Sequence, residues 1–232
     1  MIDRDHVRAQ YADEANLDTR TSVWHPTLDG KEPSCEALDI VVAAAPDRVL
    51  EVGCGTGAFA ARVSAALPHS TLVAIDQSER FVELTGRRGL DARTGDVQDL
   101  PFDDESFDLV AAMWMLYHVS DLHLGLSEVR RVLRPGGTLV AVTNGDEHVA
   151  DLRREAGGEP VITHFSSENG EDALLRHFEH VESVDLRTRA LFPDRATAIA
   201  YLESSHEDVA WQLPEFDGPR EYAGHVSIFV AS

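Results

Sequence analysis

Three glycines two residues apart separate a short apolar segment from a helix-forming one, in the stretch VLEVGCGTGAFA that begins at Val49. Gly53, Gly55 and Gly57 have no side chain to keep a ligand away from the main chain, and the amides that begin the next helix attract an anion. Glu51 adds a carboxylate just upstream. Many nucleotide-binding proteins have such a turn, although some of these turns only pack a helix against a strand.

The spacing of the glycines argues against two common phosphate sites. A dinucleotide fingerprint needs a third glycine three residues after the second, and here Phe59 stands near that position. A triphosphate-binding loop needs a lysine after its glycines, and Lys31, the only lysine of the chain, precedes them. The loop therefore suits a ligand with a small carboxylate and a ribose.

Two aspartates follow the next strands and are candidates for the rest of such a ligand. Asp76 closes the segment TLVAID, where a carboxylate can accept hydrogen bonds from both ribose hydroxyls. Its alternative role is a turn or helix N-cap acid. The carboxylate of Asp96 could bind the exocyclic amine of a purine, with Val97 against the ring, and its alternative role is an ordinary solvated loop acid. The nearby glycine loop favours ligand binding for Asp76.

These residues need strands that end together at one edge of a sheet. Continuous apolar strands alternate with helices up to Thr143, which predicts a parallel sheet covered on both faces. Ligands bind beyond the carboxyl ends of such strands. After Val161 the pattern indicates an antiparallel pair at one sheet edge. The expected strands are Arg48–Val52, Thr71–Asp76, Asp91–Thr94, Phe107–Met113, Thr138–Thr143, Val181–Leu191 and His225–Val230; the expected helices are Asp3–Asn16, Glu36–Ala45, Ala58–Leu67, Glu79–Arg88, Leu122–Leu133, Glu171–Phe178 and Arg195–Ser204, with a loop over Thr21–Ser34.

The length of 232 residues suits one globular unit, expected over residues 47–232, preceded by a helical cap over residues 1–46. The two cysteines, Cys35 and Cys54, predict neither a disulfide framework nor a zinc site, and the histidines, such as His177 and His180, show no metal-ligand spacing. No apolar run is long enough to cross a bilayer and no signal peptide is recognisable, so we expect a cytoplasmic protein without a membrane partner.

The charge is strongly acidic, with 41 acidic against 20 basic side chains and a net charge of −21. Such a surface repels phosphate backbones, so no nucleic-acid partner is expected. The acid excess is also typical of a halophile, whose salty cytosol screens the repulsion between like charges. We favour this second interpretation, under which the charge says less about the partner.

Five segments in fixed order resemble class I S-adenosylmethionine-dependent methyltransferases, of the type 11/25-like kind: VLEVGCGTG, VAIDQS, TGDVQDLPF, FDLVAAMWMLYHVSD and LRPGGTLV. The resemblance implies an α/β fold with a Rossmann-like, seven-stranded, mostly parallel sheet, helices on both faces and an antiparallel last strand. It also implies S-adenosylmethionine as the cofactor. The residues implied to bind it are Glu51, Gly53, Cys54, Gly55 and Gly57 around the methionine portion, Asp76 at the ribose, Gln77, Asp96 and Val97 at the adenine, and the main chain near Ala112 and Met113 at the sulfonium.

The flanking segments resemble a narrower bacterial and archaeal subgroup whose acceptor is not established. Its members share the opening seen here as QYADEANLDTR and an F-S-x-E-N-G segment, here Phe165–Gly170. Relatives often have Asn-His after the fourth strand, where this chain has Met113 and Trp114. Because a polar pair near the methyl group is replaced by apolar residues, the resemblance does not identify the methyl acceptor.

Methyl transfer from a sulfonium needs mainly positioning and exclusion of water, and a base only when the nucleophile arrives protonated. His118 and Tyr117 are the candidate catalytic residues, with local packing as the alternative. Tyr11 and Arg20 are expected to form a lid, in which Arg20 pairs with the cofactor carboxylate. The aromatic residues interpreted mainly as packing are Trp24, His25, Trp211 and Tyr222.

These features predict a methyltransferase that acts on a small-molecule acceptor. An RNA or protein methyltransferase is the alternative within enzymes, and it would need a positive face beside the cleft. A protein that binds the cofactor without turnover is the alternative outside enzymes. Cys54 is assigned no redox chemistry, and the oligomeric state is left open.

Overall fold

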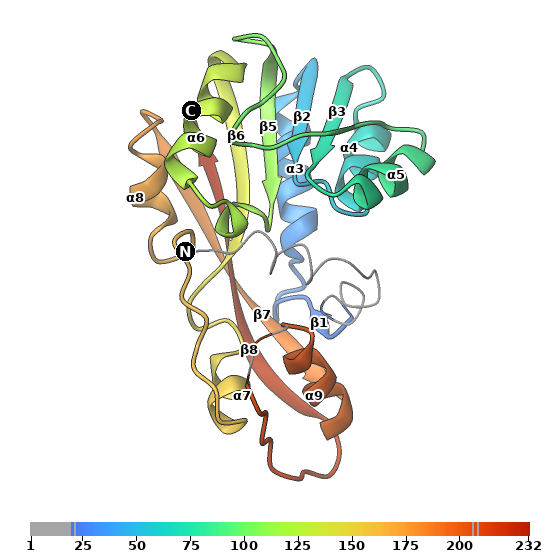
Figure 1. Cartoon of the computed structure of the whole chain (residues 1–232), viewed down its shortest axis with the longest axis vertical. Helices are drawn as coiled ribbons and strands as arrows, with labels where there is room; N and C mark the ends of the chain where they lie inside the picture. Colours follow the sequence, from blue (N-terminus) through green and yellow to red (C-terminus); the bar gives the residue numbers. More distant parts are fainter. Residues whose placement is uncertain (1–19, 21, 206, 208) are drawn as a thin grey trace.

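A computed structural model describes residues 20, 22–205, 207 and 209–232 of the chain. Within these residues it has one eight-stranded sheet with the strand order β1-β7-β8-β6-β5-β2-β3-β4, flanked by helices (Figure 1). The expected helix Asp3–Asn16 lies outside the described residues. No helix of the described part is long and apolar enough to span a bilayer.

Five neighbouring strands form the parallel part of the sheet. They are β6 (Leu133–Asn144), β5 (Phe107–Met113), β2 (Arg48–Val52), β3 (Thr71–Asp76) and β4 (Asp91–Thr94). The strands β2 and β5 are almost completely buried, which explains why their sequences are continuous apolar runs rather than alternating ones. Because all five run the same way, the loops that follow them meet at one edge, which we call the carboxyl edge.

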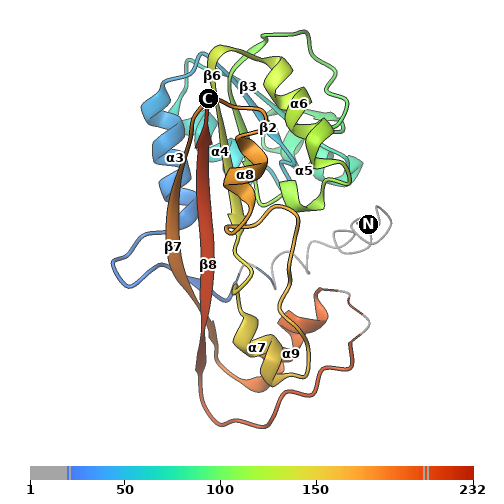
Figure 2. The same ribbon diagram turned by 90° about the vertical axis from the view of Figure 1, so that its left-hand side faces the viewer.

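Helices cover both faces of this parallel part, as Figure 2 shows with α3 on one side and α6 and α8 on the other. The first face buries apolar residues of α3 (Pro33–Ala44) and α4 (Ala58–Ala66) against β2, β5 and β6. The second face buries those of α6 (Leu122–Val132) and α8 (Gly170–Leu174) against the same strands. A further helix, α5 (Glu79–Arg87), links β3 to β4 and packs against both. α3 therefore belongs to the same core as the sheet.

A long antiparallel hairpin continues past the end of β6. The strand β8 (Arg220–Ala231) pairs with β6 only from Val226 to Ala231, whereas it pairs with β7 (Val181–Phe192) along its whole length. Both β6 and β7 run toward the carboxyl edge, so the overhanging half of the hairpin lies beyond that edge. It forms the lower part of the molecule in Figure 1.

This overhang carries a second lobe with its own core. The lobe is completed by α7 (Ala150–Glu155), α9 (Arg195–Glu203) and the two-residue strand β1 (Trp24–His25), which pairs with β7. It is held mainly by aromatic and aliphatic side chains from segments far apart in the sequence. Its buried apolar residues are Val23, Val149, Leu152, Ala156, Ala190, Phe192, Ala198, Tyr201, Leu202, Leu213 and Tyr222.

The predicted α/β fold with a mostly parallel sheet and an antiparallel last strand is confirmed, but the sheet has eight strands rather than seven. The additional strand is β1, inside the segment expected to be a loop; it is too short to be predicted and exists through its pairing with Arg189 and Ala190. Several bounds also differ. β6 and β8 each begin five residues earlier than expected, and β6 has an irregular register against β5. α3 begins three residues earlier, and α8 ends at Leu174 rather than Phe178.

Candidate functional site

The three glycines of the loop after β2 have different surroundings, although all three have positive φ angles of 69°, 52° and 72°. A Cβ atom at Gly53 would lie 2.7 Å from the Cβ of Met115, and one at Gly57 would lie 2.6 Å from Oγ1 of Thr85. A Cβ atom at Gly55 would meet nothing within 4 Å. Two glycines therefore allow close packing, and only Gly55 presents open main chain to a ligand.

Asp76 joins the end of β3 to this loop. Its Oδ2 accepts a hydrogen bond from the Gly55 amide at 2.9 Å, and its Oδ1 accepts one from the Ser78 amide at 2.9 Å. Burial raises the pKa of this carboxyl, and the amide hydrogen bonds oppose that rise. The carboxylate thus organises the turn before α5, in line with the alternative interpretation, and it also lies beside the open glycine. Gln77 follows it and is exposed.

Glu51 is an acidic side chain inside the core under the loop, with only 2% of its surface exposed. Burial, together with the negative charge of Asp76, raises its pKa to about 8, against a hydrogen bond from the Ala60 amide. Its Oε2 has no hydrogen-bond partner among the described residues. A buried carboxyl oxygen without a partner is costly, so the site fits a ligand that brings a cationic or hydrogen-donating group.

The loop after β4 holds two residues predicted to contact the adenine, Asp96 and Val97, in different surroundings. Asp96 accepts hydrogen bonds from the main-chain and side-chain nitrogens of Gln98, at 2.9 and 3.2 Å. Val97 is buried in the core, where it would meet a Cβ atom placed on Gly125. The side chain of Val97 therefore packs toward α6, and its expected contact with a ring remains a prediction.

At the end of β5 a ligand would contact the main chain rather than the side chains. Ala112 and Met113 are buried in the cores on opposite faces of the sheet. Trp114 has a positive φ of 53°, which turns the chain out of the strand. Its Nε1 donates to Oδ1 of Asn144 at 3.0 Å, so the ends of β5 and β6 are tied together.

The two candidate catalytic residues follow this turn in a single 3-10 turn, Leu116–His118. The rings of Tyr117 and His118 are 4.4 Å apart between centroids and both are half-buried. They therefore lie in the loop after β5, on the carboxyl edge. Their catalytic roles remain predictions.

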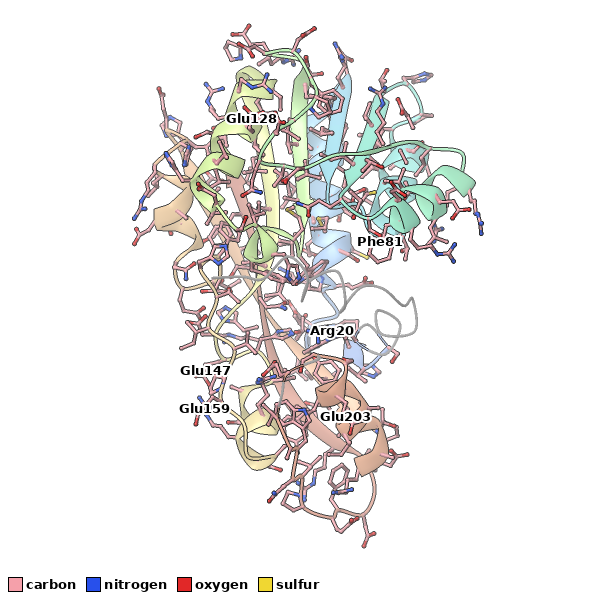
Figure 3. The ribbon with its side chains drawn as sticks, viewed as in Figure 1. Arg20, Phe81, Glu128, Glu147, Glu159 and Glu203 are labelled. Atoms are coloured by element: carbon pink, nitrogen blue, oxygen red, sulfur yellow. The ribbon has the colours of Figure 1, made fainter. Side chains whose placement is uncertain are left out.

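Of the two expected lid residues the structure describes Arg20, which lies in the second lobe. The guanidinium of Arg20 lies over the Tyr201 ring, 5.7 Å from its centroid, and Tyr11 lies outside the described residues. In Figure 3 Arg20 lies between the carboxyl edge of the parallel strands and α9. Trp24, interpreted from the sequence as packing, stacks on His148 with ring centroids 4.3 Å apart.

Two further expectations concern thiol and metal chemistry. Burial raises the pKa of the Cys54 thiol to about 12, which agrees with the absence of a redox assignment because only a thiolate reacts. No group of three or more histidine, cysteine or acidic side chains in the described part of the chain is arranged to hold a metal ion.

The F-S-x-E-N-G segment, Phe165–Gly170, proves to be a brace for the loop between β6 and α7. Oε2 of Glu168 accepts a hydrogen bond from the Asp146 amide at 2.8 Å, and Oε1 lies 3.5 Å from Nδ1 of the buried His225. The carbonyl of the first residue of the segment accepts from Oγ1 of Thr143 at 2.9 Å. The sequence showed the motif, but its partners come from distant segments.

Sequence reasoning missed Asn144 and His148, which border the carboxyl edge on the side of the second lobe. Nδ1 of His148 lies 3.0 Å from the carbonyl oxygen of His225. This contact joins residues 77 positions apart, so no local pattern announces it. Burial lowers the pKa of His148 to about 3, and the positive charge of Arg20 contributes to the same shift.

Comparison with known proteins matches residues 50–141 to the family described as "Methyltransferase domain". The chain is 33% identical over 139 residues to a malonyl-[acyl-carrier protein] O-methyltransferase of Methylococcus capsulatus, covering 56% of this chain and 50% of that one. It is 42% identical over 120 residues to a demethylmenaquinone methyltransferase of Clavibacter sepedonicus, covering 49% and 48%. This chain thus spans about half the length of these two relatives.

The fold is shared with solved structures. The geranyl diphosphate C-methyltransferase of Streptomyces coelicolor, solved with Mg²⁺, geranyl diphosphate and S-adenosyl-L-homocysteine, superposes with a TM-score of 0.60 at 16% identity. The superposition covers 98% of this chain and 96% of that one. The matched family region, residues 50–141, contains the glycine loop and both aspartates that follow β3 and β4.

Proposed function

This chain is a member of the class I S-adenosylmethionine-dependent methyltransferase family, and from that premise we propose that it transfers a methyl group from S-adenosylmethionine to a small-molecule acceptor. The observation that carries the proposal is the open main chain at Gly55, whose amide binds the half-buried Asp76, in the loop above the buried, unpartnered Oε2 of Glu51. Few ligands bring an amino group, a carboxylate and a ribose together, and this cofactor does.

The residues present fit the cofactor. Glu51, with its unpartnered Oε2, would hold the amino group, and the amides around Gly55 would hold the carboxylate. Asp76 would accept the ribose hydroxyls with the lone pairs that its two amide bonds leave available. Asp96 and Gln77 would contact the adenine. The methionine end is thereby directed to the main chain at the end of β5.

When bound, the cofactor supplies an activated methyl group on a positively charged sulfur. The protein must then orient the acceptor and keep water away. Trp114 is turned out of β5 and held by Asn144, and its apolar ring would lie beside that position. Tyr117 and His118 lie in the turn that follows Trp114, where they would be able to contact the acceptor. A base is needed only for an acceptor that arrives protonated.

The relatives support a small-molecule or carrier-linked acceptor without selecting one. Their names refer to malonyl-[acyl-carrier protein] and to demethylmenaquinone, which are chemically different. The net charge of −21 disfavours an RNA acceptor, since the phosphate backbone would be repelled. The supporting observation for a metabolite is therefore the combination of a cofactor site and an acidic surface.

Two measurements test the proposal. Calorimetry should show binding of S-adenosylhomocysteine by the purified chain, and absence of binding contradicts a methyltransferase. The chain should also transfer tritiated methyl from S-adenosylmethionine into the metabolite fraction of a cell extract. Label in the RNA or protein fraction would support the alternative enzymes, and binding without any label would support a non-catalytic cofactor-binding protein.

We also propose that the acid excess adapts the chain to a salty cytosol. Raising KCl from about 0.1 M to about 1 M shortens the screening length from about 10 Å to about 3 Å and weakens repulsion between the acids. The melting temperature should therefore rise with salt over this range. A melting temperature that is highest at low salt would exclude this adaptation.

A further inference from the structure

Two histidine side chains from distant segments meet outside the second face of the sheet, between α6 and the segment that follows α8 (Figure 2). Nδ1 of His123 lies 2.9 Å from Nε2 of His177, although the two residues are 54 positions apart in the chain. His123 is exposed and His177 is half-buried, so small ions in solution can reach the pair. Because the contact is long-range, no metal-ligand spacing announces it in the sequence.

The arrangement of the two rings differs from that of a straight hydrogen bond between imidazoles. A straight N–H···N bond with the observed nitrogen distance of 2.9 Å would place the ring centroids roughly 5.2 Å apart. The observed centroid distance is 4.6 Å, and the ring planes are inclined by 46°. The two nitrogens therefore do not point straight at each other, and a hydrogen bond between them is bent and weakened.

Both distances match those of two imidazoles bound to one metal ion at neighbouring coordination positions. An imidazole nitrogen binds a divalent transition metal at about 2.0–2.1 Å. When two such bonds meet at about a right angle, the nitrogens lie about 2.9 Å apart and the ring centroids about 4.5 Å apart. A right angle between ligands is typical of the square-planar or tetragonal coordination of Cu²⁺ and Ni²⁺.

Ser127, one turn after His123 on α6, supports the orientation of the second ring. Its Oγ lies 3.5 Å from Nδ1 of His177, the ring nitrogen that does not contact His123. When Nδ1–H donates to this hydroxyl, Nε2 keeps its lone pair for a metal, and metal-bound histidines commonly have such a partner on the other nitrogen. Burial lowers the pKa of His177, and the neighbouring His123 and Arg176 add to this shift, so the ring is uncharged at neutral pH.

We propose that His123 and His177 form a binding site for a divalent transition metal ion, Cu²⁺ or Ni²⁺ by its geometry, which clips α6 to the segment between α8 and β7. Nδ1 of His123 and Nε2 of His177 would occupy two neighbouring coordination positions, and water would fill the others. The net charge of −21 raises the concentration of cations near the protein surface. The site shares no residue with the proposed cofactor site, so the inference does not depend on the methyltransferase proposal.

The first test is calorimetry of the full chain with NiCl₂. The affinity should fall by about 100-fold in His123→Ala and in His177→Ala, because two preorganised donors bind far more tightly than one. Ser127→Ala should weaken binding by about tenfold, since it removes only the partner of a ligand. The matched control is His180→Ala, an exposed histidine three residues after His177, which should bind Ni²⁺ as wild type does. Absence of binding, or equal affinity in wild type and His123→Ala, overturns the inference.

The second test identifies the ligands directly. With one equivalent of CuCl₂, the electron paramagnetic resonance spectrum of the wild-type chain should show splitting from two coordinated imidazole nitrogens. The spectrum of His123→Ala or His177→Ala should lose the signature of the pair, whereas His180→Ala should keep it. A wild-type spectrum with oxygen ligands only, or one that is unchanged in both single variants, places the metal elsewhere and overturns the inference.

The third test measures whether the metal joins the two segments. NiCl₂ at about 100 times its dissociation constant should raise the melting temperature of wild type by roughly 5–10 °C, and a chelator should reverse the rise. His123→Ala should show no rise, because one imidazole cannot connect α6 to the segment after α8. A rise of equal size in His123→Ala overturns the clip. If Ni²⁺ binds and S-adenosylhomocysteine does not, the methyltransferase proposal fails and this inference stands.

Discussion

The cofactor loops lie at the carboxyl edge and the second lobe lies beyond it, and the two are stabilised in different ways. The cofactor side is fixed by main-chain geometry: positive φ angles at the glycines and amide hydrogen bonds to Asp76. The second lobe is fixed by packing of large rings, such as Phe192 against Tyr201 and Tyr222, with centroids 5.4 and 5.9 Å apart. We therefore expect that the packing of the second lobe can be changed without disturbing the cofactor side.

Gly55→Val should give the largest effect and tests the cofactor side. A Cβ atom at this position meets no protein atom within 4 Å, so the chain should fold, at a cost of roughly 1–2 kcal/mol for a branched residue at positive φ. It would fill the space in which the ligand approaches the main chain. We expect calorimetry to show no binding of S-adenosylhomocysteine.

The matched control for this prediction is Gly89→Val. Gly89 also has a positive φ, of 83°, and open space around its Cβ position, but it lies in the turn after α5. Its variant should lose as much stability as Gly55→Val and bind S-adenosylhomocysteine normally. Normal binding by a folded Gly55→Val variant would place the cofactor elsewhere.

Phe192→Ala tests whether the second lobe can be altered separately. Phe192 is fully buried, so its truncation should lower the free energy of unfolding by roughly 3–5 kcal/mol. The folded fraction should still bind S-adenosylhomocysteine, because the cofactor loops make no use of this core. Denaturant unfolding and calorimetry measure the two quantities.

The half-buried Phe216, which packs on the Arg220 guanidinium at 4.4 Å, provides the control in the same lobe. Phe216→Ala should cost clearly less stability than Phe192→Ala. Loss of S-adenosylhomocysteine binding in folded Phe192→Ala would show that the two sides are energetically coupled, contrary to the comparison drawn above.

Asp76→Ala should have an intermediate effect. It removes the acceptor of the ribose hydroxyls and leaves the amides of Gly55 and Ser78 without their partner. Affinity for S-adenosylhomocysteine should fall by roughly 1–3 kcal/mol. Asp91→Ala is the control, because Asp91 is an exposed acid on the neighbouring strand, paired only with Arg93, and should leave the affinity unchanged. Equal affinities for both variants would withdraw the ribose assignment.

The same difference between the two sides explains what the sequence could predict. Strands β2, β3, β4 and β5 begin and end where expected, because apolar runs and the flanking turns are local signals. The glycine loop and Asp76 were found for the same reason. Only the structure distinguishes Gly55 from the two packing glycines, since Met115 and Thr85 approach from other segments.

The second lobe could not be predicted in this way. β1 is two residues long and is held by strand pairing with residues more than 160 positions away. His148 was passed over because its position depends on His225, Trp24 and Arg20, none of which is near it in sequence. The motif Phe165–Gly170 was recognised, but its function as a brace requires knowing which loop it touches.

A pH-dependent effect on stability is expected from Glu51, whose pKa of about 8 in the folded chain lies above its ordinary value of 4.5. Between these values the unfolded chain has lost the proton and the folded chain has kept it, so the stability of the ligand-free protein falls as the pH rises and levels off above about 8. Glu51→Gln removes this dependence. Its stability relative to wild type should therefore increase between about pH 5 and 8, as measured by denaturant unfolding at both pH values.

The ligand should reverse this preference, which makes Glu51 a sharper test of the cofactor side than any truncation. An amino group beside Oε2 favours the carboxylate, so binding of S-adenosylhomocysteine at neutral pH should release a proton from Glu51. Affinity should then rise with pH below about 8, by at most about tenfold per pH unit, the limit for one linked proton. Calorimetry in buffers of different ionisation enthalpy measures the released proton directly. Glu51→Gln keeps the shape of the side chain and should release none, so equal proton release by both proteins would mean that the amino group binds elsewhere.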